Sequence, residues 1–258
     1  MADFFQEDLQ GSRFERVDLS GSEFFASDLT GSRFRGVELH RVVMRGVELA
    51  HVDIHGELLN VTINGVDIGP LVEAELDRRY PERVTMRPTD PGGFREAWNV
   101  VERLWGGTVD RARRFEPELL HESVDGEWSF IETLRHLSFA TECWLLRAIL
   151  GDPNPYAALS LPWDGMPDTD GVPRDRAARP SLDEALALRL DRQAAVRRYV
   201  DALDDATLAA DTVPVEGPGW PEPVSFPVRE CLLTIFNEEW WHRQFALRDL
   251  ALLEQRAG

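Results

Sequence analysis

Residues 4–34 of this 258-residue chain read FFQEDLQGSRFERVDLSGSEFFASDLTGSRF, and this stretch decides the fold of the first quarter. Every fifth residue in it is large and apolar, and the same period continues to residue 54. A helix repeats every 3.6 residues and a strand every two, so neither element explains a period of five. The members of this apolar row are Phe4, Leu9, Phe14, Leu19, Phe24, Leu29, Phe34, Leu39, Met44, Leu49 and Ile54.

A square coil with five residues on each side explains the period. One turn then takes twenty residues, and residues twenty apart stack at roughly the 4.8 Å spacing of paired strands. The sequence supports such a turn independently, because Gly-Ser-Arg-Phe at 11–14 recurs at 31–34 and Phe4 falls under Phe24. We therefore expect a short quadrilateral β-solenoid over residues 1–60, with the apolar row as its structural core.

These repeats resemble the pentapeptide-repeat family over residues 2–56. Some members of that family resemble duplex DNA in shape and charge and occupy the DNA site of topoisomerases. Residues 1–70 carry 12 acidic residues against 6 Arg, which is a mildly acidic surface and not a dense array of negative charge. A docking or scaffold module is therefore favoured over a topoisomerase-protecting DNA mimic.

A junction over residues 61–91 follows the coil. Asn64-Gly65 predicts a tight turn. Pro70 then marks the start of a short helix that reaches about Arg79. Several Pro and Gly residues between 81 and 93 separate this helix from the next element.

Four long helical segments are expected in the remainder, over residues 94–115, 129–150, 181–203 and 225–255. The second and third open with capping boxes, Ser129 with Glu132 and Ser181 with Glu184. The loops 152–180 and 204–224 are long, and their Trp163 and Trp220 suggest that they are ordered on the helices. The sequence therefore predicts an all-α four-helix bundle with long crossover loops over residues 92–258.

The composition excludes several classes of function. The net charge is −18, which argues against direct binding of nucleic acid. All 28 cationic residues are Arg, so a Schiff-base Lys and a P-loop Lys are both excluded. No apolar run approaches the roughly 18 residues of a membrane span, and the chain begins without the pattern of a signal peptide. With only two Cys in the chain, we expect no disulfide framework and a cytoplasmic location.

One group of residues in the bundle could hold a metal ion. Glu238 and His242 are four apart on the fourth helix and share one of its faces, and His136 lies on the second helix. Two His and one carboxylate, with open positions left, form a catalytic divalent-metal arrangement. The alternative is a solvated Glu/His pair and a buried His with an ordinary hydrogen-bond partner. Glu239 is either a partner that orients His242 or a solvated residue.

The two Cys residues and the His residues of the repeats are not interpreted as metal ligands. Cys143 and Cys231 lie seven residues from a proposed ligand, too far along the helix to bind the same ion, and we expect them in the core. His40, His51 and His55 lie in the repeats and are interpreted as surface residues.

The segment from about residue 92 to the end resembles the DinB-like superfamily of four-helix bundles. The resemblance rests on Trp128-Ser129-x-x-Glu132-x-x-x-His136-Leu137 and on Asn237-Glu238-x-x-x-His242-Arg243. It implies a divalent metal bound by three His, and here Glu238 stands in the place of one of them. The metal implied is zinc first, with nickel or iron as alternatives.

The resemblance also implies a function, because some members are transferases or isomerases that use low-molecular-weight thiols. We therefore expect a metal-activated thiol S-transferase or isomerase that acts on a small molecule, joined to a docking module. The alternative is a non-catalytic, stress-related scaffold that binds a protein partner. A homodimer stays open as the oligomeric state.

Overall fold

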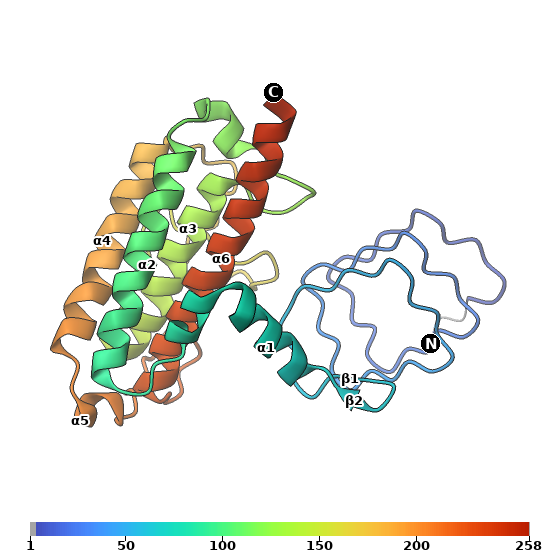
Figure 1. The fold of residues 1–258 in the computed structure, drawn as a ribbon, viewed down its shortest axis with the longest axis horizontal. Coiled ribbons are helices and arrows are strands. Elements are labelled where there is room, and N and C mark those ends of the chain that lie inside the picture. The colour runs from blue at the N-terminus through green and yellow to red at the C-terminus, as the bar shows by residue number, and fades with distance from the viewer. Residues whose placement is uncertain (1–3, 258) are drawn as a thin grey trace. The chain divides into compact units, whose positions relative to one another are not determined.

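The computed structural model describes residues 4–257. The chain divides into two compact units, one made of residues up to 52 with 164–166 and the other of the remainder. No helix within residues 4–257 is both long enough and apolar enough to cross a membrane. The elements in chain order (Figure 1) are β1 (Thr62–Ile63), β2 (Val66–Asp67), α1 (Gly69–Arg79), η1 (Pro81–Met86), α2 (Pro91–Ala112), η2 (Pro117–His121), α3 (Phe130–Thr141), η3 (Glu142–Ile149), α4 (Leu182–Ala202), α5 (Asp205–Leu208) and α6 (Val228–Ala257).

The first unit is a coil whose backbone turns at every fifth residue. Each corner has a positive φ, the left-handed conformation that bends an extended chain sharply. At one set of corners the amide of Ser12, Ser22 or Ser32 donates to the carbonyl three residues earlier, at 3.0 to 3.1 Å. The five-residue backbone period predicted from the sequence is therefore confirmed. The corners are Gln6, Gly11, Arg16, Gly21, Ala26, Gly31, Gly36, Arg41, Gly46 and His51.

The packing expected for this coil is not observed. Within residues 4–57 the backbone forms no strand, and its backbone–backbone hydrogen bonds are the local turn bonds. The large apolar side chains of the row are exposed, so the turns bury no core within these residues. The prediction of a core is thus wrong for this structure, where the row is 43 to 70% exposed: Phe4, Leu9, Phe14, Leu19, Phe24, Leu29, Phe34, Leu39, Met44, Leu49 and Ile54.

A small hairpin follows the coil and confirms the predicted turn. Strands β1 and β2 pair antiparallel, with Ile63 opposite Val66. Asn64 and Gly65 connect them, both with positive φ, as the two-residue hairpin turn requires.

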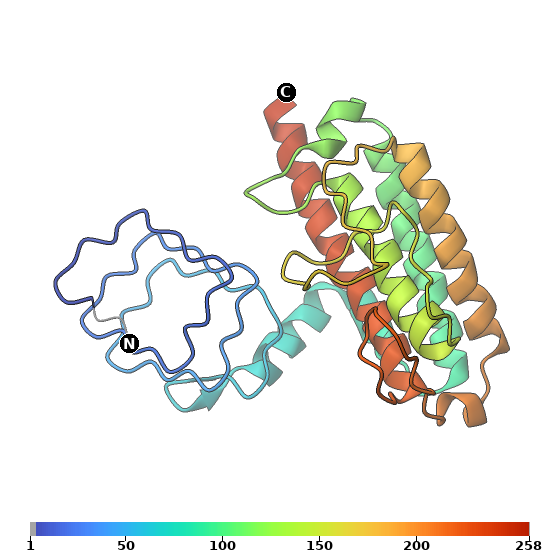
Figure 2. The same cartoon turned by 180° about the vertical axis from the view of Figure 1, so that it is seen from behind.

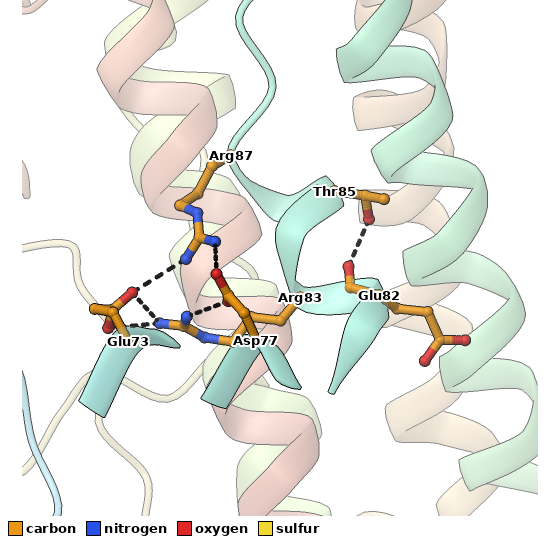
Figure 3. A network of polar contacts seen from close by, with 6 residues as sticks. All are labelled: Glu73, Asp77, Glu82, Arg83, Thr85 and Arg87. Carbon is orange, nitrogen blue, oxygen red and sulfur yellow. Dashed lines mark hydrogen bonds and ion pairs between the residues drawn. The ribbon is translucent and has the colours of Figure 1, made fainter. Parts of the chain in front are cut away.

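An ionic network ties α1 to η1 (Figure 3). The Arg83 guanidinium donates to Glu73 and Asp77 at 2.7 to 2.8 Å, and Arg87 donates to the same two carboxylates. Arg83 is buried and its guanidinium also lies over the Trp241 ring, 5.6 Å from the centroid. The network therefore fixes α1 to η1, and the ring contact places Arg83 against α6.

The second unit is built on four long helices, α2, α3, α4 and α6, and confirms the predicted bundle (Figure 2). Helix α3 packs against both α4 and α6, and α2 packs against the same two helices. The apolar face of α2 lies in the interior, where Trp98 stacks on Phe236 of α6 at 5.7 Å between centroids. Helix α3 continues as the π-helix η3, a change of hydrogen-bonding pattern that the sequence pattern did not predict.

The two long loops are ordered, as their Trp residues suggested. The Tyr156 hydroxyl donates to the Trp220 carbonyl at 2.9 Å and accepts from the Trp220 amide at 2.8 Å. The Trp163 and Trp220 rings meet edge to face at 5.0 Å. Hydrogen bonds and ring packing therefore join the loop after η3 to the loop before α6.

Candidate metal centre

His136 is positioned by the start of α3. The Ser129 hydroxyl accepts from the Glu132 amide, and the Glu132 carboxylate accepts from the Ser129 amide, so the predicted capping box is present. Two helical turns after this cap, the imidazole of His136 points into the bundle and is 6% exposed. Its Nδ1 lies 3.0 Å from the carbonyl oxygen of Leu161, in the loop after η3.

Glu238 and His242 come from α6, which packs against α3. One Glu238 carboxylate oxygen lies 2.9 Å from His242 Nε2 and 3.4 Å from His136 Nε2. One ligand atom from each of the three residues lies within 4.8 Å of the other two. The structure therefore brings together all three residues that the sequence analysis proposed as ligands.

The hydrogen bond to Leu161 decides which nitrogen of His136 faces the centre. A carbonyl oxygen only accepts, so Nδ1 of His136 must carry the proton. In the neutral imidazole Nε2 then has a lone pair and no proton, and this lone pair faces the Glu238 carboxylate. Two acceptors at this distance repel unless a cation, either a proton or a metal ion, lies between them.

The protonation states at the centre suit metal binding. Burial on its own would raise the pKa of the Glu238 carboxyl, but hydrogen bonds that His136 and His242 donate when a proton is on Nε2 outweigh it and hold this pKa well below its ordinary value. Burial lowers the pKa of the His242 imidazole, and the bond with Glu238 opposes this only in part. An ionised carboxylate and a neutral imidazole are the forms that bind a divalent ion.

Aromatic rings surround the imidazoles. Trp128 stacks on His242 with 5.6 Å between centroids and lies 4.4 Å from the His136 ring. Phe139 lies 6.3 Å from His136, and Phe245 meets His242 edge to face. These contacts restrict rotation of both imidazoles and limit the access of water to them.

Glu239 has neither of the roles considered for it. It is 1% exposed and its carboxylate accepts a short hydrogen bond from Arg189 of α4, so it is not solvated and does not orient His242. Burial raises the pKa of Glu239, and the charge of Arg189 opposes the shift. The reason is the helix geometry, since a residue one position after Glu238 points about 100° away from it.

The remaining Cys and repeat His residues are where the sequence analysis expected them. Cys143 and Cys231 are buried in the bundle, and burial raises the pKa of both thiols, that of Cys231 to about 11. His40, His51 and His55 are exposed in the coil region.

Two groups beside the centre were missed from the sequence. One is the backbone carbonyl of Leu161, which no side-chain pattern can indicate. The other is Arg189, which meets Glu239 from fifty residues away on another helix. Only the packing of the loop and of α4 on the bundle reveals either group.

A four-helix bundle with two imidazoles and a carboxylate converging from two facing helices defines a class of potential metal-binding proteins. The family model of the DinB superfamily matches residues 70–246, and the chain belongs to that superfamily, which is generally metal-binding. The family model of pentapeptide repeats (8 copies) matches twice, over residues 2–36 and 22–56, so the chain joins a pentapeptide-repeat region to a DinB superfamily domain. No curated protein and no solved structure matches the chain significantly.

Proposed function

We propose that His136, Glu238 and His242 bind one divalent metal ion. The observation that carries this proposal is that Nε2 of both imidazoles converges on one Glu238 carboxylate oxygen, at 2.9 Å for His242 and 3.4 Å for His136. A divalent cation bound among these groups would have two nitrogen ligands and one oxygen ligand. Zinc fits this donor set best, and nickel and iron accept the same ligands.

We further propose that the protein is a metal-dependent thiol transferase or isomerase. A bound divalent ion lowers the pKa of a coordinated thiol and so supplies a thiolate nucleophile near neutral pH. The chain's own thiols do not suit this role, because Cys143 and Cys231 are buried with raised pKa values. A low-molecular-weight thiol from solution is therefore the nucleophile in this proposal, and a small electrophile is its substrate.

The chain's residues have separate tasks in this chemistry. His136 and His242 supply neutral nitrogens, and Glu238 supplies charge. Trp128 packs against both imidazoles and keeps them aimed at the same point. Three protein ligands leave room for the thiol, as in catalytic zinc sites.

Metal analysis of the protein purified without a His tag tests the proposal. We expect about one divalent ion per chain, as in other three-ligand sites, with zinc the main metal. His136→Ala and His242→Ala should each lose it, and His51→Ala, an exposed His of the coil, is the matched control. Equal metal content in His51→Ala and His136→Ala would refute the assignment, and metal-free wild-type protein would favour the non-catalytic scaffold.

For the coil, we propose a docking module for a protein partner, formed when its turns close onto one another as a β-solenoid. The support is the regular five-residue backbone period together with the apolar row, which is exposed in this structure and would be buried in a closed solenoid. Burial of each large side chain of this row would contribute roughly 1.5 to 3 kcal/mol.

A further inference from the structure

Arg135, the residue before the proposed ligand His136, is a buried cation held by backbone groups. Arg135 is 1% exposed, although burying a charged group is costly unless it is paired or hydrogen-bonded. Its Nε donates to the Leu159 carbonyl at 2.7 Å, and its two terminal nitrogens donate to the carbonyls of Asp175 and Ala178. Arg135 therefore joins two distant parts of the loop after η3 to helix α3.

The same loop supplies the hydrogen-bond partner of His136. The Leu161 amide donates to the Arg135 carbonyl at 3.3 Å, and the Leu161 carbonyl accepts from His136 Nδ1 at 3.0 Å. The short segment from Leu159 to Leu161 is thus attached to Arg135 at both ends. This attachment holds the Leu161 carbonyl in hydrogen-bonding position at Nδ1 of His136.

We propose that Arg135 is a positioning residue for the metal centre. By holding the loop, it keeps the Leu161 carbonyl on Nδ1 of His136, which fixes the Nδ1–H tautomer and aims the Nε2 lone pair at Glu238. Partners of this kind set the tautomer and orientation of metal-binding imidazoles, and their loss weakens metal binding about 10- to 100-fold. The effect on metal binding rests on the proposed function, whereas the effect on the tautomer does not.

The chain offers a matched control in Arg147. This side chain is also 1% exposed, and it donates to three backbone carbonyls, those of Pro153, Val215 and Gly217. It joins the two long loops to η3 but makes no hydrogen bond to the Leu159–Leu161 segment. Replacing it leaves three carbonyls without their donor, as replacing Arg135 does, without touching the partner of His136.

The experiment compares Arg135→Met with Arg147→Met. The first readout is the tautomer of His136 in the metal-free protein, from the ¹⁵N chemical shifts of the ring. The second is the dissociation constant for zinc, and urea unfolding shows whether the two variants lose similar stability. We expect a mixture of tautomers and zinc binding weaker by about tenfold or more in Arg135→Met. Arg147→Met should keep the Nδ1–H tautomer and wild-type zinc affinity.

Two results would overturn the inference. One is an unchanged tautomer in Arg135→Met, and the other is an equal loss of zinc affinity in both variants. If wild-type protein binds no zinc, the proposed function fails, and the tautomer comparison alone still decides the role of Arg135. If either Met variant does not fold, Arg135→Lys and Arg147→Lys, which keep one donating group, take their place with the same expected contrast.

Discussion

Glu238 determines the charge of the proposed centre. One of its carboxylate oxygens lies 2.9 Å from His242 Nε2 and 3.4 Å from His136 Nε2, and it is the one proposed ligand that can carry a negative charge. The resemblance to the DinB-like superfamily places a His at this position. With Glu238 as a ligand, the net charge of a bound divalent ion and its three ligands is lower by one than with three neutral ligands. The ion is then a weaker Lewis acid toward a further ligand.

Glu238→His should therefore retain the metal and make it a stronger Lewis acid. The thiol added to a cobalt-loaded protein should ionise at a pH lower by about one unit or more, because removing one negative charge favours the thiolate. The ionisation can be followed by charge-transfer absorption of the cobalt. An unchanged or higher midpoint in Glu238→His would contradict this account of the charge. Glu238→Ala, with two ligands left, should bind metal far more weakly.

The pH dependence of metal binding is set in part by His242. Burial lowers the pKa of this imidazole, so its neutral, ligating form persists to a lower pH than that of a free imidazole. The His242 ring of the metal-free protein should consequently stay neutral as the pH falls through about 6.5, the ordinary His value, and become protonated only at lower pH. The ¹⁵N chemical shifts of the His242 ring between pH 5 and 8 measure this midpoint, and a midpoint at or above 6.5 would show that His242 is not shielded as described.

At the scale of elements, α4 and α6 are joined by a fully buried ion pair. Arg189 and Glu239 are each 1% exposed, and the Arg189 guanidinium also lies 5.0 Å from the centroid of the Trp105 ring. A buried charge that loses its partner is strongly destabilising, whereas an apolar pair of similar size can replace both.

Arg189→Met or Glu239→Leu alone should lower the free energy of unfolding by about 3 to 5 kcal/mol. The double variant should recover most of that loss, since neither charge then remains in the interior. Urea unfolding of the four proteins gives the coupling energy directly. Additive losses in the double variant would mean that the two side chains are stabilised by groups other than each other.

Local signals explain how much of the bundle could be predicted. The capping boxes at Ser129 and Ser181 predicted the starts of α3 and α4 to within one residue, because a cap is encoded within four positions. Helix periodicity likewise predicted that Glu238 and His242, four residues apart, share one face of α6. The Leu161 carbonyl could not be predicted, because its contact with His136 depends on the course of a long loop.

At the scale of the whole molecule, the coil shows the limit of a periodic pattern. The five-residue spacing predicted the corners correctly because each corner is a local backbone event. Stacking of successive turns depends on contacts between residues twenty apart, and the structure contains no backbone bonds between turns within residues 4–57. The periodic sequence is compatible with an open coil as well as with a closed one.

Phe24→Asp tests whether the coil closes. In a closed solenoid the charge would lie in an apolar column and cost several kcal/mol, so proteolysis of residues 1–60 should become much faster. Phe25→Asp is the control, because Phe25 lies outside the apolar row and is 85% exposed. The bundle should unfold as in the wild type in both variants. Equal protease resistance of the two variants would show that the row is not buried.

Anomalous diffraction from crystals of the zinc-loaded protein, with data on both sides of the zinc edge, tests the central claim most directly. The account predicts one strong anomalous peak per chain, bonded to Nε2 of His136, Nε2 of His242 and the carboxylate of Glu238. Zinc–nitrogen and zinc–oxygen distances should be about 2.0 to 2.2 Å. No peak among these three residues, or a peak bonded to His136 through Nδ1, would contradict the account.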